Sequence, residues 1–224
     1  MRLRLIVVGV LSVALLMPGL LLAGVASAAL TGSTPVDLSV AGQDASAPVV
    51  AVSADGVTQT VTWRRFDGAH NRVQVAASTD SGATWSAAVD LSAAGQHAYG
   101  PVVAVSADGV TQTVTWYRSD GANYRVQVAT STDSGATWSA AVDLSAAGQN
   151  ASDPVVAVSA DGVTQTVTWQ RFDGANYLVQ VAASTDSGVT WSAPATLSAA
   201  GQDADDPVVA VSADGVTQTV TWRR

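Results

Sequence analysis

The sequence contains no cysteine, no lysine and no glutamate, so its charge comes from 18 aspartates and 10 arginines. The missing cysteine excludes disulfides, thiolate catalysis and cysteine-ligated zinc. The missing lysine excludes Schiff-base chemistry, and the missing glutamate removes every mechanism that needs a glutamate acid, base or nucleophile. The formal net charge of −8, together with the lack of any basic run, argues against a nucleic-acid partner.

The N-terminal segment is typical of an export signal. Arg2 and Arg4 precede an uncharged run over residues 5–25, and the Ala-Ser-Ala at 26–28 supplies the small residues that a signal peptidase requires. We therefore expect a signal peptide over residues 1–28 and a secreted bacterial protein. Because the apolar run is long, the alternative is an uncleaved anchor, and only in that case do we expect contact with a membrane.

The remaining domain, residues 29–224, is one unit repeated. The sixteen residues PVVAVSADGVTQTVTW start at Pro48, Pro101, Pro154 and Pro207, at a constant spacing of 53 residues. The repeats cover about 48–100, 101–153 and 154–206, with a partial fourth over 207–224.

The sequence pattern of each repeat predicts four short strands and no helix. In the first copy, alternating hydrophobicity and turn residues place the strands over 49–53, 57–64, 72–78 and 85–92. On the second of these strands, valines and Trp63 share one face and threonines share the other, as in a half-buried strand.

Four-stranded repeats of this length are typical of β-propeller blades. We therefore predict an all-β, propeller-like array of four-stranded antiparallel blades, about three complete and one partial. Residues 33–39 repeat a fourth-strand sequence, so this N-terminal strand is a candidate for closing the last blade. The alternative is part of a longer propeller, because a missing strand leaves an unpaired sheet edge. Such an edge on the incomplete last blade also offers a surface for self-association.

An eight-residue turn of the pattern S-x-D-x-G-x-T-W follows the third strand at 78–85, 131–138 and 184–191. Its aspartate can accept hydrogen bonds from the turn, its glycine can adopt a left-handed conformation, and its tryptophan can cover the hairpin. The pattern resembles the Asp box, or BNR repeat, of sialidase-like β-propellers. The resemblance implies a structural role, on the face away from the ligand, for Asp80, Gly82, Trp85, Asp133, Gly135, Trp138, Asp186, Gly188 and Trp191.

The resemblance does not extend to the catalytic residues of that family. Its enzymes pair a tyrosine nucleophile with a glutamate and carry an Arg-Ile-Pro motif, and the chain has neither glutamate nor that motif. No Gly-x-Ser-x-Gly occurs, and His70 and His97 have no triad context. We therefore expect no catalytic residue, no metal or other cofactor and no enzymatic activity. The alternative is a fragment of a larger sialidase-like glycoside hydrolase whose catalytic residues lie outside this chain.

The copies differ mainly in two connections, which an up-and-down blade places at one end. These connections hold every tyrosine, phenylalanine and histidine of residues 29–224. Aromatic rings can stack on sugars and arginines can pair with carboxylates, although drift in exposed loops explains the same variation without a ligand. We expect an extracellular binding or scaffold module for glycans or cell-envelope polymers. The expected ligand contacts are Arg118, Tyr124, Arg171 and Tyr177.

Overall fold

The computed structural model describes residues 4–5 and 34–224, and all regular structure in them is β-strand. The predicted signal peptide, apart from Arg4 and Leu5, lies outside these described residues. Within the same residues there is no helix of the length and apolarity that a membrane span requires.

Three antiparallel sheets of four strands repeat the same meander, in which each strand pairs with the next along the chain. Blade 1 comprises β3 (Ala45–Val52), β4 (Gln59–Phe66), β5 (Asn71–Ser78) and β6 (Val89–Asp90). Blade 2 comprises β7 (Ala98–Val105), β8 (Gln112–Ser119), β9 (Tyr124–Ser131) and β10 (Val142–Asp143). Blade 3 comprises β11 (Ala151–Val158), β12 (Gln165–Phe172), β13 (Tyr177–Ser184) and β14 (Ala195–Thr196). The predicted all-β blade architecture is confirmed.

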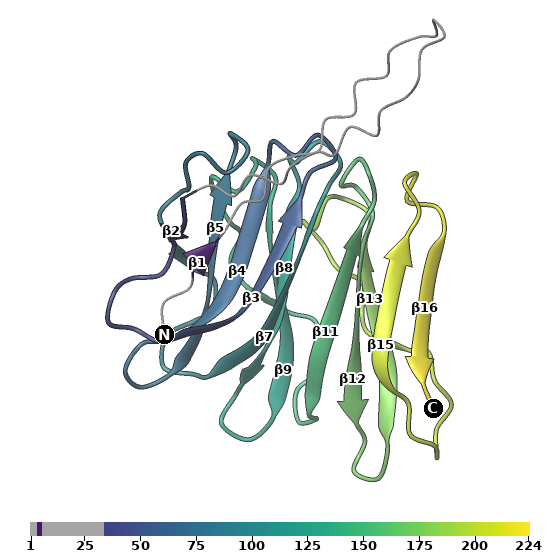
Figure 1. The fold of residues 1–224 in the computed structure, drawn as a ribbon. Helices are drawn as coiled ribbons and strands as arrows, with labels where there is room; N and C mark the ends of the chain where they lie inside the picture. Colours follow the sequence, from purple (N-terminus) through teal and green to yellow (C-terminus); the bar gives the residue numbers. More distant parts are fainter. Residues whose placement is uncertain (1–3, 6–33) are drawn as a thin grey trace, which may run out of the picture.

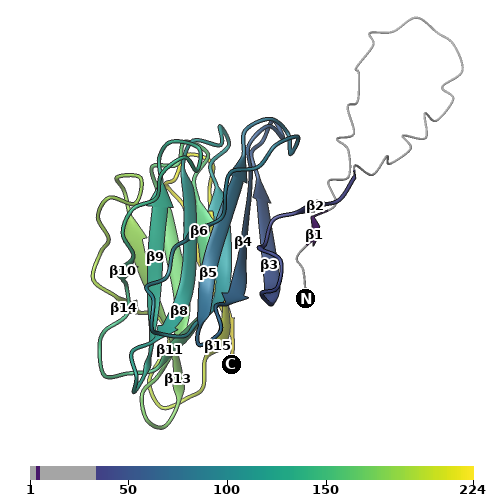
Figure 2. The same cartoon turned by 90° about the vertical axis from the view of Figure 1, so that its left-hand side faces the viewer.

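The blades stack side by side as an open array. Figure 1 shows the first strands β3, β7 and β11 in chain order, followed by β15 (Asp205–Val211). Figure 2, turned by 90°, shows β3, β4 and β5 of blade 1 side by side. Blade 4 contains only β15 and β16 (Gln218–Arg223) in the described residues. The array is therefore not closed into a ring.

The N-terminal strand does not close the last blade, so that part of the prediction is wrong. The strand is β2 (Val36–Asp37), and it pairs with β1 (Arg4–Leu5). In the complete blades a fourth strand pairs with a third strand, as β6 does with β5. Blade 4 has no described third strand to receive β2, which pairs with β1 instead.

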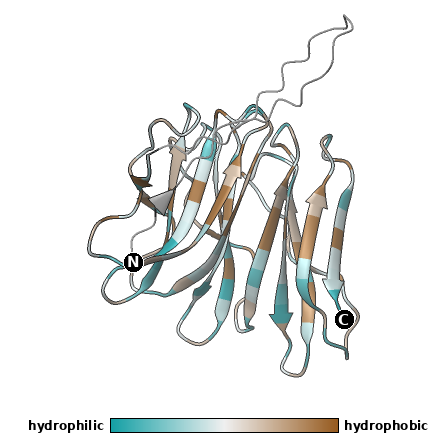
Figure 3. Cartoon of the chain, in the orientation of Figure 1, coloured by the Kyte–Doolittle hydropathy of each residue, from teal (hydrophilic) through white to brown (hydrophobic). Residues whose placement is uncertain are grey.

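The second strand of each complete blade is buried on both faces, because each blade is covered by its neighbours. Trp116 on β8 is fully buried and packs against Val73 and Val75 of blade 1. On β4 of blade 1, the face that carries the threonines lies against blade 2. There Thr60 Oγ1 donates to Gln112 Oε1 at 2.7 Å. Figure 3 shows apolar bands across the middle of the strands. The prediction of a half-buried strand is therefore wrong for β4, β8 and β12, since stacked blades leave neither face to solvent.

Trp222 of blade 4 shows what this stacking contributes. The equivalent residues Trp63, Trp116 and Trp169 have no exposed area, whereas Trp222 is 37% exposed. In blade 2 the indole nitrogen of Trp116 donates to Gln127 of the third strand, which has no described counterpart in blade 4.

Two strand boundaries differ from the predicted ones. The first strand starts at Ala45, before a bulge at Ala47, whose φ of 52° lets the pairing continue past Pro48. The fourth strand shrinks to two residues, because serine hydroxyls replace the ladder on both sides of it. Ser86 Oγ accepts from Ala77 N at 3.0 Å, and Ser92 Oγ accepts from Val73 N at 3.0 Å.

The turns between first and second strands form a ladder across the array. Ala54 N donates to Ala107 O, and Ala107 N donates to Ala160 O, both at 2.9 Å. Ala160 N continues the series to Ala213 O at 3.0 Å. Each blade is thus held to the next by a backbone hydrogen bond as well as by side chains.

Candidate functional site

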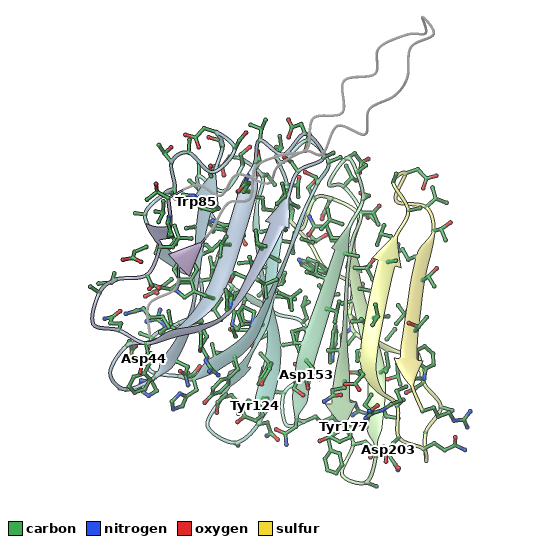
Figure 4. The ribbon with its side chains drawn as sticks, in the orientation of Figure 1. Asp44, Trp85, Tyr124, Asp153, Tyr177 and Asp203 are labelled. Atoms are coloured by element: carbon green, nitrogen blue, oxygen red, sulfur yellow. The ribbon has the colours of Figure 1, made fainter. Side chains whose placement is uncertain are left out.

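The two ends of the array carry different residues, as the strand order predicts. In Figure 4, Trp85 of the first Asp box lies at one end, and Asp44, Tyr124, Asp153, Tyr177 and Asp203 lie at the other. We call these the Asp-box end and the aromatic end. The variable connections between copies lie at the aromatic end.

The Asp-box carboxylates accept hydrogen bonds from groups of their own turns. Asp80 Oδ1 accepts from Thr84 N and from Ser78 Oγ, both at 2.8 Å, and Oδ2 accepts from Thr84 Oγ1 at 2.6 Å. These hydrogen bonds, led by that of the Thr84 hydroxyl, lower the pKa of Asp80 to about 2. The equivalent hydrogen bonds in the third Asp box lower the pKa of Asp186 to about 2, and those in the second lower the pKa of Asp133.

The Asp-box glycines and tryptophans contact the scaffold. Gly135 has a φ of 84°, and a Cβ there would lie 2.5 Å from Ala77 Cβ of the preceding blade. Trp138 packs against the core between blades 1 and 2, and Trp191 against the core between blades 2 and 3. The aspartates, glycines and tryptophans of the Asp boxes thus have the geometry of folding elements.

Three tyrosines of blade 2 gather at the aromatic end. The ring centroid of Tyr117 lies 5.7 Å from that of Tyr99 and 5.4 Å from that of Tyr124. Gly100 makes this cluster fit, because a Cβ there would lie 2.8 Å from the Tyr117 ring. The first, second and third strands of one blade thus each supply one ring.

A cavity of about 360 Å³ opens beside this cluster, between blades 2 and 3. Blade 3 contributes Phe172 and Tyr177, whose ring centroids are 5.3 Å apart. The lining consists of Tyr99, Tyr117, Tyr124, Asn150, Ser152, Phe172 and Tyr177. Its volume lies at the lower end of the range of ligand pockets, and five of its seven residues are aromatic.

Asn150 offers the cavity a hydrogen-bond donor. Its Oδ1 accepts from Tyr124 N at 2.9 Å, and since a backbone N–H can only donate, this bond fixes the orientation of the amide. The Nδ2 group then points elsewhere and has no hydrogen-bond partner among residues 34–224. The side chain therefore both ties blade 2 to blade 3 and presents two free N–H groups.

The structure brings together two of the four predicted ligand contacts. Tyr124 and Tyr177 line the cavity, and each is 39% exposed. Arg118 instead donates to Gln96 and lies 3.5 Å from Asp143, and Arg171 donates to Gln149. Neither arginine is part of the lining.

The sequence analysis missed the other lining residues as a group. Tyr99, Tyr117 and Phe172 lie in the variable connections, but they belong to different strands that only the folded sheet brings together. Asn150 precedes β11 and Ser152 lies on it, so both come from the start of the following blade. Among the described residues, no group of three or more histidine and aspartate side chains is placed to hold a metal ion.

Residues 33–219 match the BNR repeat-like domain, and the chain belongs to that family. No curated protein sequence matches the chain at a significant level.

Two solved structures share the fold at low identity. A Hadza microbial sialidase aligns with a TM-score of 0.53 and 16% identity, over 80% of this chain and 44% of that one. An ulvan lyase of a new polysaccharide lyase family aligns with a TM-score of 0.56 and 10% identity, over 86% of this chain and 53% of that one. The chain thus spans about half the length of each.

The prediction that the chain is not an enzyme is contradicted. The two solved structures that share its fold are enzymes, a sialidase and a polysaccharide lyase. The prediction rested on the missing glutamate and Arg-Ile-Pro, and these residues test for a single hydrolytic mechanism. The fold itself serves more than one class of enzyme, so the missing residues do not define the class of this chain.

Proposed function

We propose that the chain binds a glycan in the cavity between blades 2 and 3. The observation that carries this proposal is the lining of five aromatic rings with polar groups on the same surface. Sugars present apolar C–H faces to aromatic rings and hydroxyls to hydrogen-bonding groups, and this lining provides both.

The family and fold support the same class of ligand. The sialidase and the ulvan lyase are named for action on glycans, and the chain shares their blade architecture. The cavity lies at the end opposite the Asp boxes, where the copies differ from one another. A surface that varies between copies of a constant scaffold is where a specific ligand contact is expected.

Titration calorimetry with a panel of soluble oligosaccharides tests this proposal. Tyr124→Ala and Tyr177→Ala are expected to weaken binding at least about tenfold, because each removes a stacking ring. Phe66→Ala is the matched control, since Phe66 is similarly exposed at the same end but does not line the cavity. Binding that survives both tyrosine variants, or that fails equally in the control, would count against this site.

A second candidate function is cleavage of the bound glycan, which the two enzymes of the same fold favour. New reducing ends would report hydrolysis, and ultraviolet absorbance of an unsaturated sugar would report elimination. If the cavity holds the substrate, Tyr177→Ala should lower product release in parallel with binding. Product release that is unchanged in this variant would place the reaction elsewhere.

Export of the protein is part of the proposal. The arginines and the apolar run of residues 1–28 support it. Mass spectrometry of the protein from a bacterial culture medium should find Ala29 as the first residue. A cell-bound protein that retains Met1 would favour an anchor.

A further inference from the structure

We infer that the ligand of this cavity is a neutral, linear oligosaccharide that runs across blades 2 and 3. This inference rests on the proposed function and names the class of glycan. It departs from what the resemblance to sialidases suggests, because a sialic acid carries a carboxylate.

The lining contains no charged side chain. Four tyrosines, one phenylalanine, one asparagine and one serine make up the surface. Recognition of a carboxylate normally uses an arginine fork that pairs with both oxygens. The cavity offers hydroxyl and amide groups instead, which suit the hydroxyls of uncharged sugars.

The arginines around the cavity are held by protein acceptors. Arg125 donates to Ser145 O at 2.6 Å and lies 3.2 Å from Asp143. Arg64 donates to Ser46 Oγ at 2.9 Å, and its guanidinium carbon lies 5.6 Å from the Tyr99 ring centroid. As described above, Arg118 and Arg171 are bonded to glutamines. None of the four lines the cavity.

Two aspartates lie near the cavity as well as Arg64. Burial raises the pKa of Tyr117, and the charge of Asp153 raises it further. Asp203 lies on the blade 3 side, where its Oδ1 accepts from Tyr177 N at 2.9 Å. The net charge of −8 on the whole chain adds a long-range repulsion of an acidic glycan.

The repeat explains why a linear chain fits. Tyr124 and Tyr177 occupy the same position in successive repeats, so neighbouring blades present the same ring. Both rings line one cavity. The backbone N–H of Tyr124 donates to Asn150, and that of Tyr177 donates to Asp203, so each tyrosine is held to the following blade in the same way. An extended oligosaccharide contacts both rings, whereas a single sugar reaches one.

The experiment uses the full chain and two sets of probes. Neutral probes are the linear hexasaccharides of β-1,4-linked glucose, mannose and xylose, and acidic probes are hexagalacturonate and sialyllactose. Calorimetry at about 0.05 M and about 0.5 M NaCl separates charge-driven binding from stacking, because salt screens only the former. We expect one or more neutral hexasaccharides to bind at least about tenfold more tightly than either acidic probe, with little change in salt.

Two further measurements test the length and charge of the ligand. The monosaccharide of the preferred sugar should bind at least about tenfold more weakly than the hexasaccharide, because a single sugar reaches only one ring. Asp153→Asn removes the nearby charge while keeping a residue that tolerates its left-handed φ of 52°. This variant should leave the neutral affinity within about twofold and bring hexagalacturonate closer to it.

The outcomes separate the inference from the proposed function. Tighter, salt-sensitive binding of an acidic probe that depends on Tyr124 and Tyr177 would overturn the neutral ligand and keep the glycan site. Equal affinity for monosaccharide and hexasaccharide would overturn the linear ligand. Failure of every probe, or binding that ignores both tyrosines, would overturn the proposed function itself.

Discussion

The Asp-box end and the aromatic end of the array are built from the same strands but use their polar groups in opposite ways. At the Asp-box end, Asp80 bonds within its own turn and Gly135 touches the preceding blade. At the aromatic end, Asn150 makes one bond to the scaffold and keeps its amide N–H groups free. The Asp-box carboxylate therefore has its hydrogen bonds satisfied by the protein, while the Asn150 amide retains N–H groups for a ligand.

This difference accounts for where the repeats are alike and where they differ. The Asp boxes of blades 2 and 3 contact the preceding blade, so a change there disturbs a contact between blades. The connections at the aromatic end need only one acceptor between blades, which His97, Asn150 and Asp203 supply with different chemistry. Different residues are tolerated at this position because each of them can accept the hydrogen bond from the neighbouring blade.

The largest effect is expected for Gly135→Ala at the Asp-box end. It combines a left-handed φ with a clash against Ala77, and should cost about 3 kcal/mol of unfolding free energy. Gly121→Ala at the aromatic end is the control, since its φ is 99° but nothing lies within 4 Å of the new Cβ, and should cost about 1 kcal/mol. Urea denaturation measures both. Equal losses would show that the Asp-box glycine serves only its own backbone.

The second largest effect is expected for acid, which should lower the stability that the Asp boxes contribute. The pKa values of Asp80 and Asp186 are lowered to about 2 from an ordinary 3.8, so their stabilising contribution is complete above about pH 4. It is lost as the pH falls towards 2, because the unfolded chain then binds protons more readily than the folded one. Thermal unfolding between pH 5 and pH 2 should show this decline, and Asp80→Asn combined with Asp186→Asn should flatten it. An equally steep decline in that double variant would assign the acid sensitivity to other aspartates.

Two variants of Asn150 separate its role as a hydrogen-bond acceptor in the scaffold from its role as a donor to a ligand. Asn150→Ala removes the acceptor of Tyr124 N and should cost about 1 kcal/mol of stability. Asn150→Asp keeps the acceptor, as Asp203 does for Tyr177, and should fold normally while binding neutral glycans several-fold more weakly. Calorimetry and denaturation on the same samples test the pair. Normal binding by Asn150→Asp would show that the amide N–H groups do not face the ligand.

The smallest effect is expected for His97→Asn. The Nδ1 atom of His97 accepts from Asn71 N at 3.1 Å, and an asparagine oxygen can take over this role, as it does at position 150. The change in stability should stay within about 0.5 kcal/mol, and glycan binding should not change because His97 does not line the cavity. A substantial loss of stability would mean that the histidine ring, which lies 5.8 Å from the Tyr99 ring, supports the cluster.

The sequence predicted the features that depend on neighbouring residues. The Asp box joins residues two and four positions apart, so its geometry can be inferred from its pattern, and the 53-residue period predicted stacked blades. The cavity depends on residues from two blades, and no local pattern shows which of them meet. The roles of Arg118 and Arg171 could have been found, because an arginine stands at this position in every copy, including Arg65, which bonds Gln43. A residue that every copy shares serves the scaffold more readily than a ligand specific to one or two blades.

The ladder of alanine backbone bonds has a consequence for how such a chain can change its length. Every rung from Ala54 to Ala213 joins the same atoms of successive copies and runs in the same direction. Deleting or duplicating one whole repeat therefore leaves each remaining junction with the partners it had before. Recombination between identical coding segments can thus lengthen or shorten the array by whole blades, while a shift of a single residue would break the spacing at that junction.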